Sequence, residues 1–557
     1  MTVEKLITDH IDIWSSALQT RSTVGRGSNG KIDLYGIKKL RELILELAVR
    51  GKLVPQDPND EPASELLKRI AAEKAELVKQ GKIKKQKLLP EISEDEKPFE
   101  LPVGWEWVRF GKIYEMEYGN NLPQEKRTNT GEYNVYGSNG VVGTHNVACV
   151  NSPCIVIGRK GSAGALNLSL NIGCWVTDVA YSSIPPIAMN LDFVFMQFHT
   201  LGLDSLGKGI KPGLNRNDAY GLTIAIPPKN EQENIVLKVK ELMSLCDQLE
   251  QQSLINLDAH QQLVETLLAT LTDSQNAEEL AENWARISQH FDSLFTTEAS
   301  IDALKQTILQ LAVMGKLVPQ DPNDEPASEL LKRIEQEKAQ LVKEGKIKKH
   351  PPVEPLGEPA LLPRSWLNIV VQDFADIRLG STPDRSEKKY WNGDIPWVSS
   401  GEVANEVILD TKEKITPEGF KNSSTSMIPT GSLLMAIIGQ GKTRGQTAIL
   451  GIDACTNQNV AAFVFNQVLV EPEYVWIWAK SKYLSHRGDG HGGAQPALNG
   501  KKVRSFIFPL APIKEQQRIV SEVKRLNDIC DTLQSRLQAA QQTQRHLADA
   551  LTDAALN

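Results

Sequence analysis

The stretch GKLVPQDPNDEPASELLKRI occurs at Gly51–Ile70 and again, without a single change, at Gly315–Ile334 of this 557-residue chain. An identical run of this length in two places indicates that one structural unit has been used twice, and such repetition has to be interpreted before any local motif. The two copies start too far apart for a solenoid repeat of roughly 20–50 residues. The sequence therefore predicts two similar units in tandem.

The similarity extends on both sides of the repeated stretch, with gaps. Both copies continue to a GKIKK stretch, which ends at Lys85 and Lys349. LPVGW, ending at Trp105, corresponds to LPRSW, ending at Trp366. Further along, EQENIVLKVKELMSLCDQL, which starts at 231, corresponds to EQQRIVSEVKRLNDICDTL, which starts at 515. Each unit thus has similar ends around a divergent middle, and the second middle is about twenty residues longer.

The ends of the units predict helices. One heptad seam comprises Ile519, Val523, Leu526, Cys530, Leu533, Leu537, Ala540, Leu547 and Leu551. Its counterpart comprises Ile235, Val239, Leu242, Cys246 and Leu249, turns polar at Ser253, Asn256 and His260, and recovers at Leu263 and Leu267. Each helix is expected to be about forty residues, roughly 60 Å, long. Shorter amphipathic helices are predicted before each repeated stretch and again from Ala63 to Gly81, with a twin ending at Gly345.

The middles change to short runs rich in glycine, β-branched and aromatic residues, such as CIVIGRKGSAGAL and SLLMAIIGQGKTRGQTAIL, which indicates β-rich domains. The predicted fold class is α+β, with two β-rich domains separated by long antiparallel coiled-coil helices in a pseudo-two-fold arrangement. The expected division is a helical region and linker at 1–100, a β-rich domain at 101–228, a central helical region and linker at 229–361, a second β-rich domain at 362–512, and a final helix at 513–557.

Composition narrows the class of protein. Hydrophobic residues make up 41% of the chain, enough for real cores, and the net charge is −7, which gives no electrostatic indication of nucleic acid. No run of eighteen apolar residues occurs, and MTVEKLITDHIDIW is too polar for a signal peptide, so a cytoplasmic protein is expected. Six cysteines lack CxxC or histidine spacing for zinc, which favours buried thiols and no metal.

One local pattern, AIIGQGKT at Ala436–Thr443, fits the loose form of a phosphate-binding loop. Such a loop needs a helix that starts at the Gly-Lys-Thr, and the sequel RGQTAILGI predicts a strand instead. The first unit has IVIGRKGSAGAL at this point, and both units share a Gly, five residues and a second Gly, which pairs Gly158 with Gly439 and Gly164 with Gly445. The shared feature is a strand followed by a polar loop.

Candidates for contact with DNA come from this loop and from a second, Gly-rich loop pair, GKGIKPGLNRND at 207–218 and GHGGAQPALNGKK at 490–502, because their side chains are donors suited to phosphates and base edges. Asn139 and Ser400, beside matched glycines, are added to them. An exposed, charged turn without a ligand is the alternative. The candidates in the first middle are Asn139, Arg159, Lys160, Ser162, Lys208, Lys211, Asn215 and Arg216. Those in the second are Ser400, Gln440, Lys442, Thr443, Arg444, His491, Gln495, Asn499, Lys501 and Lys502.

Charge counts limit the expected affinity. Residues 101–228 hold nine basic and nine acidic residues, and residues 362–512 hold sixteen and fourteen. Neither middle is strongly basic, so phosphate contacts alone predict modest binding and favour partners that share the DNA. No methyltransferase motif, metal-ligand spacing or nuclease cluster is present, which predicts a chain without catalytic residues.

The repeated LAVRGKLVPQDPNDEPASELLKRI block, the LPxxW entry into each middle and the EQxxIV start of each long helix resemble the specificity subunit of type I restriction-modification systems. The resemblance covers almost the whole chain. It implies that each middle is a target recognition domain that reads one half of a bipartite, asymmetric double-stranded DNA sequence. The paired helices, the conserved regions of that family, then set the spacer between the halves.

The resemblance also implies the partners. Two methylation subunits use S-adenosylmethionine to methylate adenine N6, and two restriction subunits translocate on ATP with Mg and cleave, while the specificity subunit binds no cofactor and has no enzymatic activity. Two other functions stay open at this point: a nucleotide-binding enzyme built on Lys442, and an adaptor that does not contact DNA.

Overall fold

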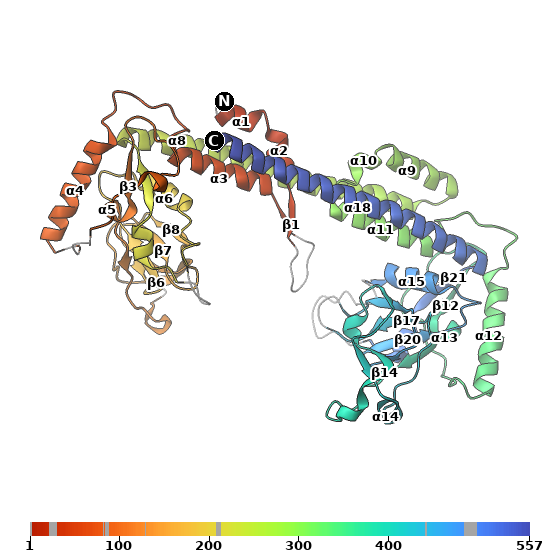
Figure 1. Cartoon of the computed structure of the whole chain (residues 1–557). Helices are drawn as coiled ribbons and strands as arrows, with labels where there is room; N and C mark the ends of the chain where they lie inside the picture. Colours follow the sequence, from red (N-terminus) through yellow and green to blue (C-terminus); the bar gives the residue numbers. More distant parts are fainter. Residues whose placement is uncertain are drawn as a thin grey trace. The chain divides into compact units, whose positions relative to one another are not determined.

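The computed structural model describes residues 3–21, 31–81, 83, 88–128, 130–207, 213–439, 443–483 and 498–557. These fall into two compact units (Figure 1). Unit 1 comprises residues 1–19, 32–254 and 541–557, and unit 2 comprises residues 20–31 and 255–540. Two long helices are shared: α8 (Lys229–Asp273, 45 residues) runs from unit 1 into unit 2, and α18 (Ile513–Leu556, 44 residues) runs from unit 2 into unit 1. The predicted α+β fold with two β-rich domains and long helices is confirmed.

The remaining elements follow the tandem plan. The other helices are α1 (Val3–Thr8), α2 (Ile11–Ser16), α3 (Tyr35–Val49), α4 (Ala63–Lys79), α5 (Phe110–Ile113), α6 (Leu191–Thr200), α7 (Arg216–Tyr220), α9 (Ala277–Gln289), α10 (Phe291–Leu294), α11 (Glu298–Val313), α12 (Ala327–Lys343), α13 (Val371–Phe374), α14 (Pro417–Lys421), α15 (Pro472–Ser481) and α17 (Gly500–Arg504). Short 3-10 turns are η1 (Glu94–Glu96), η2 (Gln124–Lys126), η3 (Lys388–Tyr390) and η4 (Ser400–Glu402).

Strands β1 (Gln19–Arg21) and β2 (Lys31–Asp33) pair near the N-terminus. The first β-rich domain contains β3 (Glu106–Arg109), β4 (Glu117–Tyr118), β5 (Tyr133–Gly137), β6 (Gly140–His145), β7 (Cys154–Gly158), β8 (Leu166–Ser169), β9 (Trp175–Val176), β10 (Ala180–Ser183) and β11 (Thr223–Ile226). Its sheets have the orders β4-β10-β7-β8, β6-β5-β9 and β11-β3.

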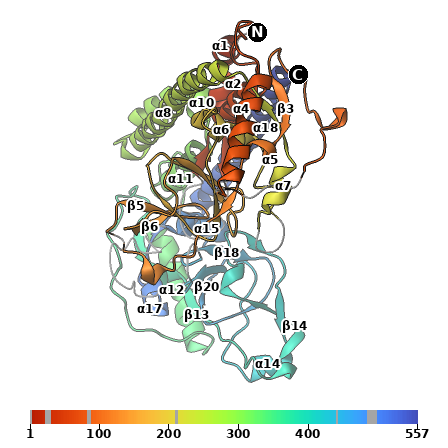
Figure 2. The same ribbon diagram turned by 90° about the vertical axis from the view of Figure 1, so that its left-hand side faces the viewer.

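The second β-rich domain contains β12 (Leu367–Val370), β13 (Asp376–Leu379), β14 (Trp391–Val398), β15 (Val407–Ile408), β16 (Glu413–Ile415), β17 (Leu433–Ala436), β18 (Thr447–Leu450), β19 (Cys455–Thr456), β20 (Val460–Val464) and β21 (Ile507–Leu510). Its sheets have the orders β13-β20-β17-β18-β15, β16-β14-β19 and β12-β21. The two domains therefore share one topology, and β15 extends the larger sheet of the second. In both views α14 lies at the end of this domain away from α18 (Figures 1 and 2).

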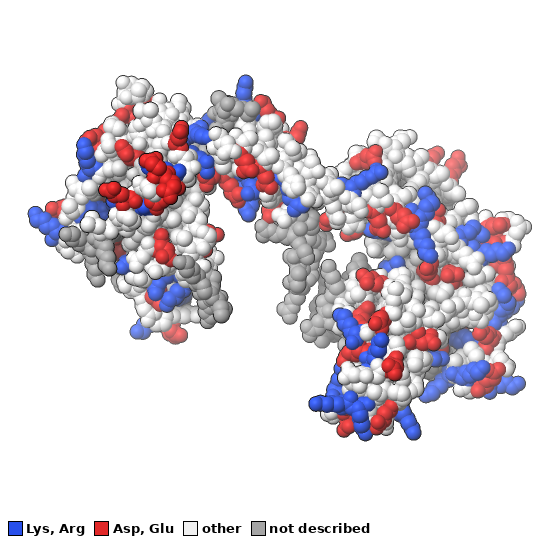
Figure 3. Space-filling model, in the orientation of Figure 1, with Lys and Arg blue, Asp and Glu red and all other residues white. Residues whose placement is uncertain are grey.

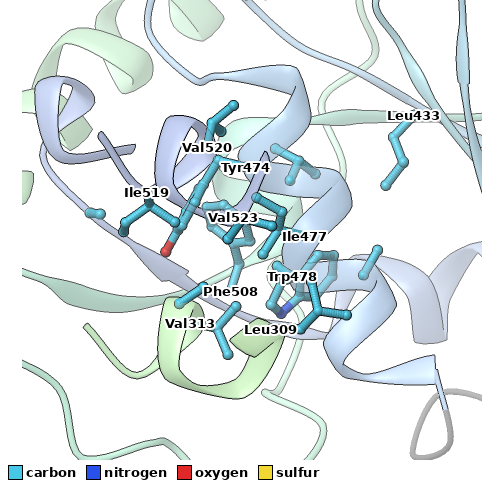
Figure 4. Close-up of a cluster of buried hydrophobic side chains, with 14 of the residues drawn as sticks. Leu309, Val313, Leu433, Tyr474, Ile477, Trp478, Phe508, Ile519, Val520 and Val523 are labelled. Atoms are coloured by element: carbon cyan, nitrogen blue, oxygen red, sulfur yellow. The ribbon is translucent and has the colours of Figure 1, made fainter. Parts of the chain in front are cut away.

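The first and last strands of each β-rich domain pair with each other. β3 is antiparallel to β11, and β12 is antiparallel to β21, so the chain enters and leaves each domain at one place. In unit 2 a continuous apolar core joins this place to the helices, with side chains from α11, α15, β21 and α18 in contact (Figure 4). Two buried polar groups in it are satisfied: Tyr474 Oη donates to Pro509 O at 2.8 Å, and Trp478 Nε1 donates to Ile507 O at 3.1 Å.

The repeated stretch, the LPxxW entry and the EQxxIV start meet in one joint in each unit. In unit 1 the buried carboxylate of Glu231 accepts hydrogen bonds from Trp105 Nε1 at 2.9 Å and Gln56 Nε2 at 3.1 Å. Gly51 has a φ of 66°, and a Cβ there would lie 2.5 Å from Pro102, so glycine is needed both for the turn and for this close approach.

The joint in unit 2 has the same construction. Gln320 Nε2 donates to the buried carboxylate of Glu515 at 2.5 Å, and Gly315, with a φ of 68°, packs against Pro363. Burial raises the pKa of both Glu231 and Glu515, an effect that their hydrogen bonds partly offset. The stretch that is identical in sequence thus fixes each β-rich domain to a long helix.

A lysine of each repeated stretch also binds the last carbonyl groups of a long helix. Lys52 Nζ donates to Leu556 O of α18 at 2.7 Å, and Lys316 Nζ donates to Thr272 O and Ser274 O after α8 at 2.5 and 2.9 Å. A cation at this end complements the helix dipole and satisfies carbonyls that lack an intrahelical partner.

The predicted heptad seams are confirmed in their first halves and wrong further on. Ile235 and Cys246 in α8, and Ile519 and Cys530 in α18, are buried. Leu263 and Leu547, however, are 51% and 42% exposed, while their neighbours Val264 and Ala548 are buried. In α8 the reason is a change of partner, because Val264 and the following buried positions pack in one cluster with α9, α10 and α11.

Candidate nucleic-acid interface

Three polar segments of the first β-rich domain meet at one edge. The loop after β7 is joined to the segment before α7 by a bridge between Lys160 and Gly213, and Leu214 N donates to Arg159 O at 2.9 Å. A Cβ on Gly158 would lie 2.4 Å from Ser138 O, so the β5–β6 turn that carries Asn139 touches the same loop. The structure therefore brings Asn139, Arg159, Lys160, Ser162 and the 215–216 pair together from distant parts of the sequence.

Two of these residues form a cluster with tyrosines. The guanidinium groups of Arg159 and Arg216 each lie 4.7 Å from the ring centre of Tyr118. Arg159 also lies 5.9 Å from the ring centre of Tyr181, and the two tyrosine rings are 5.1 Å apart. We call Tyr118, Arg159, Tyr181 and Arg216 the arginine–tyrosine cluster.

Backbone carbonyls fix both arginines in the cluster. Arg159 Nη1 donates to Asp178 O at 2.8 Å, and Arg216 Nη1 donates to Met116 O at 3.0 Å. Tyr181 is 1% exposed and its Oη donates to Leu214 O, whereas Tyr118 is 51% exposed. Sequence reasoning missed both tyrosines, since single aromatic residues in short strands give no signal until strand pairing places them beside the arginines.

Backbone pairing identifies the corresponding positions of the second β-rich domain. Tyr118 pairs with Tyr181 across β4 and β10, and Leu379 pairs with Ala461 across β13 and β20. Tyr181 in turn pairs with Ile157, as Ala461 pairs with Met435. The residue after each of these strands continues the same register. Arg159 N donates to Val179 O, and Ile437 N donates to Asn459 O, both at 2.9 Å. Ile437 therefore occupies the position of Arg159.

This register corrects the expected pairing of glycines. Gly164 N donates to Gly158 O, and Gly445 N donates to Ala436 O, each at 2.8 Å, so Gly164 and Gly445 correspond as expected but Gly158 corresponds to Ala436 rather than to Gly439. The loop of the second domain is consequently three residues longer than that of the first. The mispairing arose because equal spacing was assumed where an insertion lies.

Two of the three candidate asparagines act as helix caps. Asn215 Oδ1 accepts a hydrogen bond from Asn217 N at the start of α7, and Asn499 Oδ1 accepts one from Lys502 N at the start of α17. This is the typical N-cap arrangement, and it explains why a Leu-Asn pair occurs in both domains. Gly500, next to its cap, therefore corresponds to Arg216, next to Asn215.

The other candidates of the second domain are less closely grouped. Thr443 and Arg444 lie in the turn before β18, and Thr443 O accepts a hydrogen bond from Gln446 N at 3.0 Å. Ser400 begins η4, which packs against β17, and Lys501 and Lys502 lie in α17, beside β13. Gln440, Lys442, His491 and Gln495, with Lys208 and Lys211 of the first domain, lie outside the described residues.

The stretch that fits the loose form of a phosphate-binding loop lacks, among its described residues, the helix that nucleotide binding needs. β17 ends at Ala436, and the chain reaches the turn at 443–445 and then β18, without a helix after Thr443 among the described residues. A helix N-terminus is what such a loop offers to phosphates. The described residues therefore do not favour a nucleotide-binding enzyme.

A group of basic side chains at the α14 end of the second domain was absent from the sequence candidates. It comprises Lys388 and Lys389 of η3, Lys414 of β16, Lys412 and Lys421. Ion pairs of Lys389 with Glu418 and of Lys414 with Asp410 neutralise part of this charge. Figure 3 shows acidic side chains interspersed with basic ones over both β-rich domains on the face drawn.

An arginine at that end is neutralised as well. Arg385 lies 3.9 Å from the ring centre of Trp391 and 5.1 Å from that of Trp397, and its Nη2 donates to Glu413 Oε2 at 2.9 Å. By contrast, no ion pair within the described part of the chain involves Arg159 or Arg216. Within the described residues, these two arginines of the first domain thus differ from Arg385 in having no carboxylate partner.

The described residues contain no group of three or more His, Cys, Asp and Glu side chains arranged to hold a metal ion. None of their helices has both the length and the apolar character that crossing a bilayer requires.

Comparisons with known proteins match both β-rich domains to one family model. The model of the type I restriction modification DNA specificity domain matches residues 102–259 and 363–541. The chain is 46% identical to the EcoAI specificity subunit and 47% identical to the EcoEI specificity subunit, both type I restriction enzymes of Escherichia coli, with 100% of each chain covered. A solved structure of an HsdS subunit from Thermoanaerobacter tengcongensis is 16% identical over 83% of this chain and 98% of that one, with a TM-score of 0.37.

Proposed function

The chain belongs to the family of type I restriction-modification DNA specificity subunits, and from this premise we propose how its parts divide the work. Each β-rich domain reads one half of a bipartite, asymmetric DNA target, and the chain itself carries no catalytic residues. The observation that carries the proposal is that two domains of one topology and one register have different side chains at equivalent positions. The shared backbone makes two similar DNA-binding domains, and their different side chains recognise two different half-sites.

The long helices set the distance between the two half-sites in this proposal. Both α8 and α18 contribute to the two units, and each is continuous through more than forty residues. A continuous helix is a stiff spacer with a rise of about 1.5 Å per residue. Inserting four residues, about one turn, within 250–270 should change the spacer and leave both half-sites unaltered; a fixed spacer would refute the role of the helices.

Two grooves of related construction support partners that bind in two copies. One, of about 880 Å³, is lined in part by Leu47, Lys52 and Leu53 with the last residues of α18. The other, of about 250 Å³, is lined in part by Leu311, Lys316 and Leu317, which are the same positions of the second repeat. Duplicated side chains favour one kind of partner used twice, in keeping with two methylation subunits that use S-adenosylmethionine and two restriction subunits that use ATP and Mg.

Sequencing of modified adenines in cells that carry the complete system tests the proposal. We expect methylation at a single bipartite sequence with two unlike halves and a fixed spacer, because each domain reads its own half. A complex of this chain with its methylation subunits should also protect that sequence selectively in a pool of random duplexes. Protection without sequence preference would favour an adaptor role instead.

A further inference from the structure

The arginine–tyrosine cluster has no counterpart at the equivalent positions of the second β-rich domain. Strand register and helix caps place Leu379 where Tyr118 lies, Ile437 where Arg159 lies, Ala461 where Tyr181 lies and Gly500 where Arg216 lies. Four residues that meet in one cluster are thus replaced together by apolar or small ones. A Cβ added to Gly500 would lie 3.5 Å from Leu379 Cδ1 and 3.5 Å from Arg504 Nη1, so the replacements are also neighbours, and the arginine beside them comes from the end of α17.

The two clusters differ in what they expose. In the second domain Ile437 is 2% exposed and Ala461 is fully buried, whereas Leu379 is 44% exposed, so only part of this site belongs to the core. In the first domain Tyr118 is half exposed, and the two guanidinium groups beside it are only partly buried. The same backbone edge therefore exposes an apolar side chain in one domain and a tyrosine with two partly buried guanidinium groups in the other.

The geometry of the arginines suits the edge of a base better than a phosphate alone. Each guanidinium lies over the ring of Tyr118 and donates one Nη1 hydrogen bond to a carbonyl, which fixes its plane and direction. Its remaining N–H groups have no hydrogen-bond partner among the described residues. A fixed guanidinium fork is matched by O6 and N7 of guanine in the major groove.

We propose that the arginine–tyrosine cluster recognises a guanine in the half-site of the first β-rich domain, through the free N–H groups of Arg159 or Arg216, with Tyr118 as the positioning residue. This rests on the proposed function, that each β-rich domain reads one half-site. The second domain, with Leu379 and Ile437 at these positions, has no such contact. The two halves then differ at the base pair that this edge faces.

Arginine-to-lysine variants separate base reading from charge. Arg159→Lys and Arg216→Lys keep the positive charge but lose the two-pronged donor geometry. In the complex with the methylation subunits, one of them should lower the preference for guanine over the other bases at one position by roughly 5- to 150-fold, the range of one bidentate contact. Binding to the second half-site and to unrelated DNA should stay within about twofold of wild type.

Arg127→Lys is the matched control, because Arg127 is in the same domain and donates to Val142 O at 3.1 Å but is not stacked on an aromatic ring. It should leave base preference unchanged. Tyr118→Phe keeps the ring and should retain the preference, whereas Tyr118→Leu, the residue of the second domain, should weaken it.

The probe for the base is 7-deazaguanine, which lacks the N7 acceptor but still pairs with cytosine. Placed at the guanine in question, it should weaken wild-type binding and cause no further loss in the sensitive lysine variant. A first half-site without any G·C pair would overturn the proposal. So would lysine variants that both leave base preference intact. If the wild-type complex shows no sequence preference at all, that result contradicts the proposed function itself and not only the guanine contact.

Discussion

The two β-rich domains have the same framework and differ at the edge that the framework presents. Both are closed by paired first and last strands, both fix their loops through hydrogen bonds of the same register, and both start a short helix with a capping asparagine. At that edge they differ in side chains and loop length, since one domain has arginines and tyrosines and the other has Leu379 and Ile437. Backbone pairing and caps hold the domain in shape, so the edge is free to vary.

The largest effect is expected from exchanging a whole domain. Replacing residues 101–228 by the corresponding region of a relative should change one half of the methylated sequence completely and leave the other half and the spacer unchanged. The reason is that the chain enters and leaves the domain at one place, held by the β3–β11 pair. Methylation mapping provides the measurement, and an altered second half would contradict separate reading.

A charge placed at the buried position of Ile437 should destabilise the second domain. Ile437→Arg puts a cation at a position that is 2% exposed, and an unpaired buried charge costs about 3–5 kcal/mol. The reverse change, Arg159→Ile, is expected to cost less than about 1 kcal/mol, because it removes a partly exposed group. Denaturant unfolding followed by tryptophan fluorescence compares the two; equal losses would show that the edges do not differ in packing.

The two joints between a β-rich domain and a long helix are alike, so the same substitution should reduce stability equally in the two units. Trp105→Ala and Trp366→Ala each remove a nearly buried indole at the point where a β-rich domain meets a long helix, and should cost about 3–5 kcal/mol. Calorimetry of the complex with its methylation subunits should show the same decrease for both. A large loss in only one unit would mean that the joints, though alike in sequence, are not equivalent.

The lysines that bind helix ends should show a small difference. Lys316→Ala removes two hydrogen bonds to carbonyls of the α8 end and is expected to cost about 1 kcal/mol, whereas Lys52→Ala removes one exposed bond at the α18 end and should cost a few tenths. Hydrogen exchange of the last turns of α8 and α18 detects both losses, with arginine at each position as the control that keeps the cation.

The smallest effect concerns pH. The pKa of Glu231 is raised above its usual value near 4.5, chiefly by burial, so folding favours its protonated form. Its contribution to stability is therefore greatest below pH 4.5 and decreases as the pH rises through the raised pKa. The stability of wild type minus that of Glu231→Gln should fall over this interval; a constant difference would exclude the titration of Glu231. Glu515→Gln repeats the measurement in the other joint.

The sequence predicted the parts of the molecule that repeat. Two identical stretches, two LPxxW entries and two EQxxIV starts were enough for the tandem plan and the long helices. What escaped prediction depends on tertiary contacts: the seam of α8 moves from Leu263 to Val264 because α9–α11 become its partners. The pairing of Gly158 with Ala436 likewise became visible only through backbone hydrogen bonds.

The candidate site was predicted in part for the same reason. Loop composition pointed to Arg159 and Arg216 separately, and nothing in the sequence indicates that they lie over one ring. Tyr118 was missed because its strand has two residues, too short for periodicity to reveal which face it presents. The asparagines at 215 and 499 were expected in contact with DNA, and their side-chain oxygens cap helices.

The pairing of first and last strands also has a consequence for folding entropy. Because β3 pairs with β11, and β12 with β21, the two ends of each folded β-rich domain lie together. When the helices assemble, a folded domain of more than a hundred residues therefore acts as a short loop that is already closed. The entropic cost of closing an open loop grows only with the logarithm of its length. Here the pairing of the domain's own strands overcomes that cost. Lengthening a domain, as in the second by about twenty residues, therefore adds nothing to what the helices must overcome to assemble.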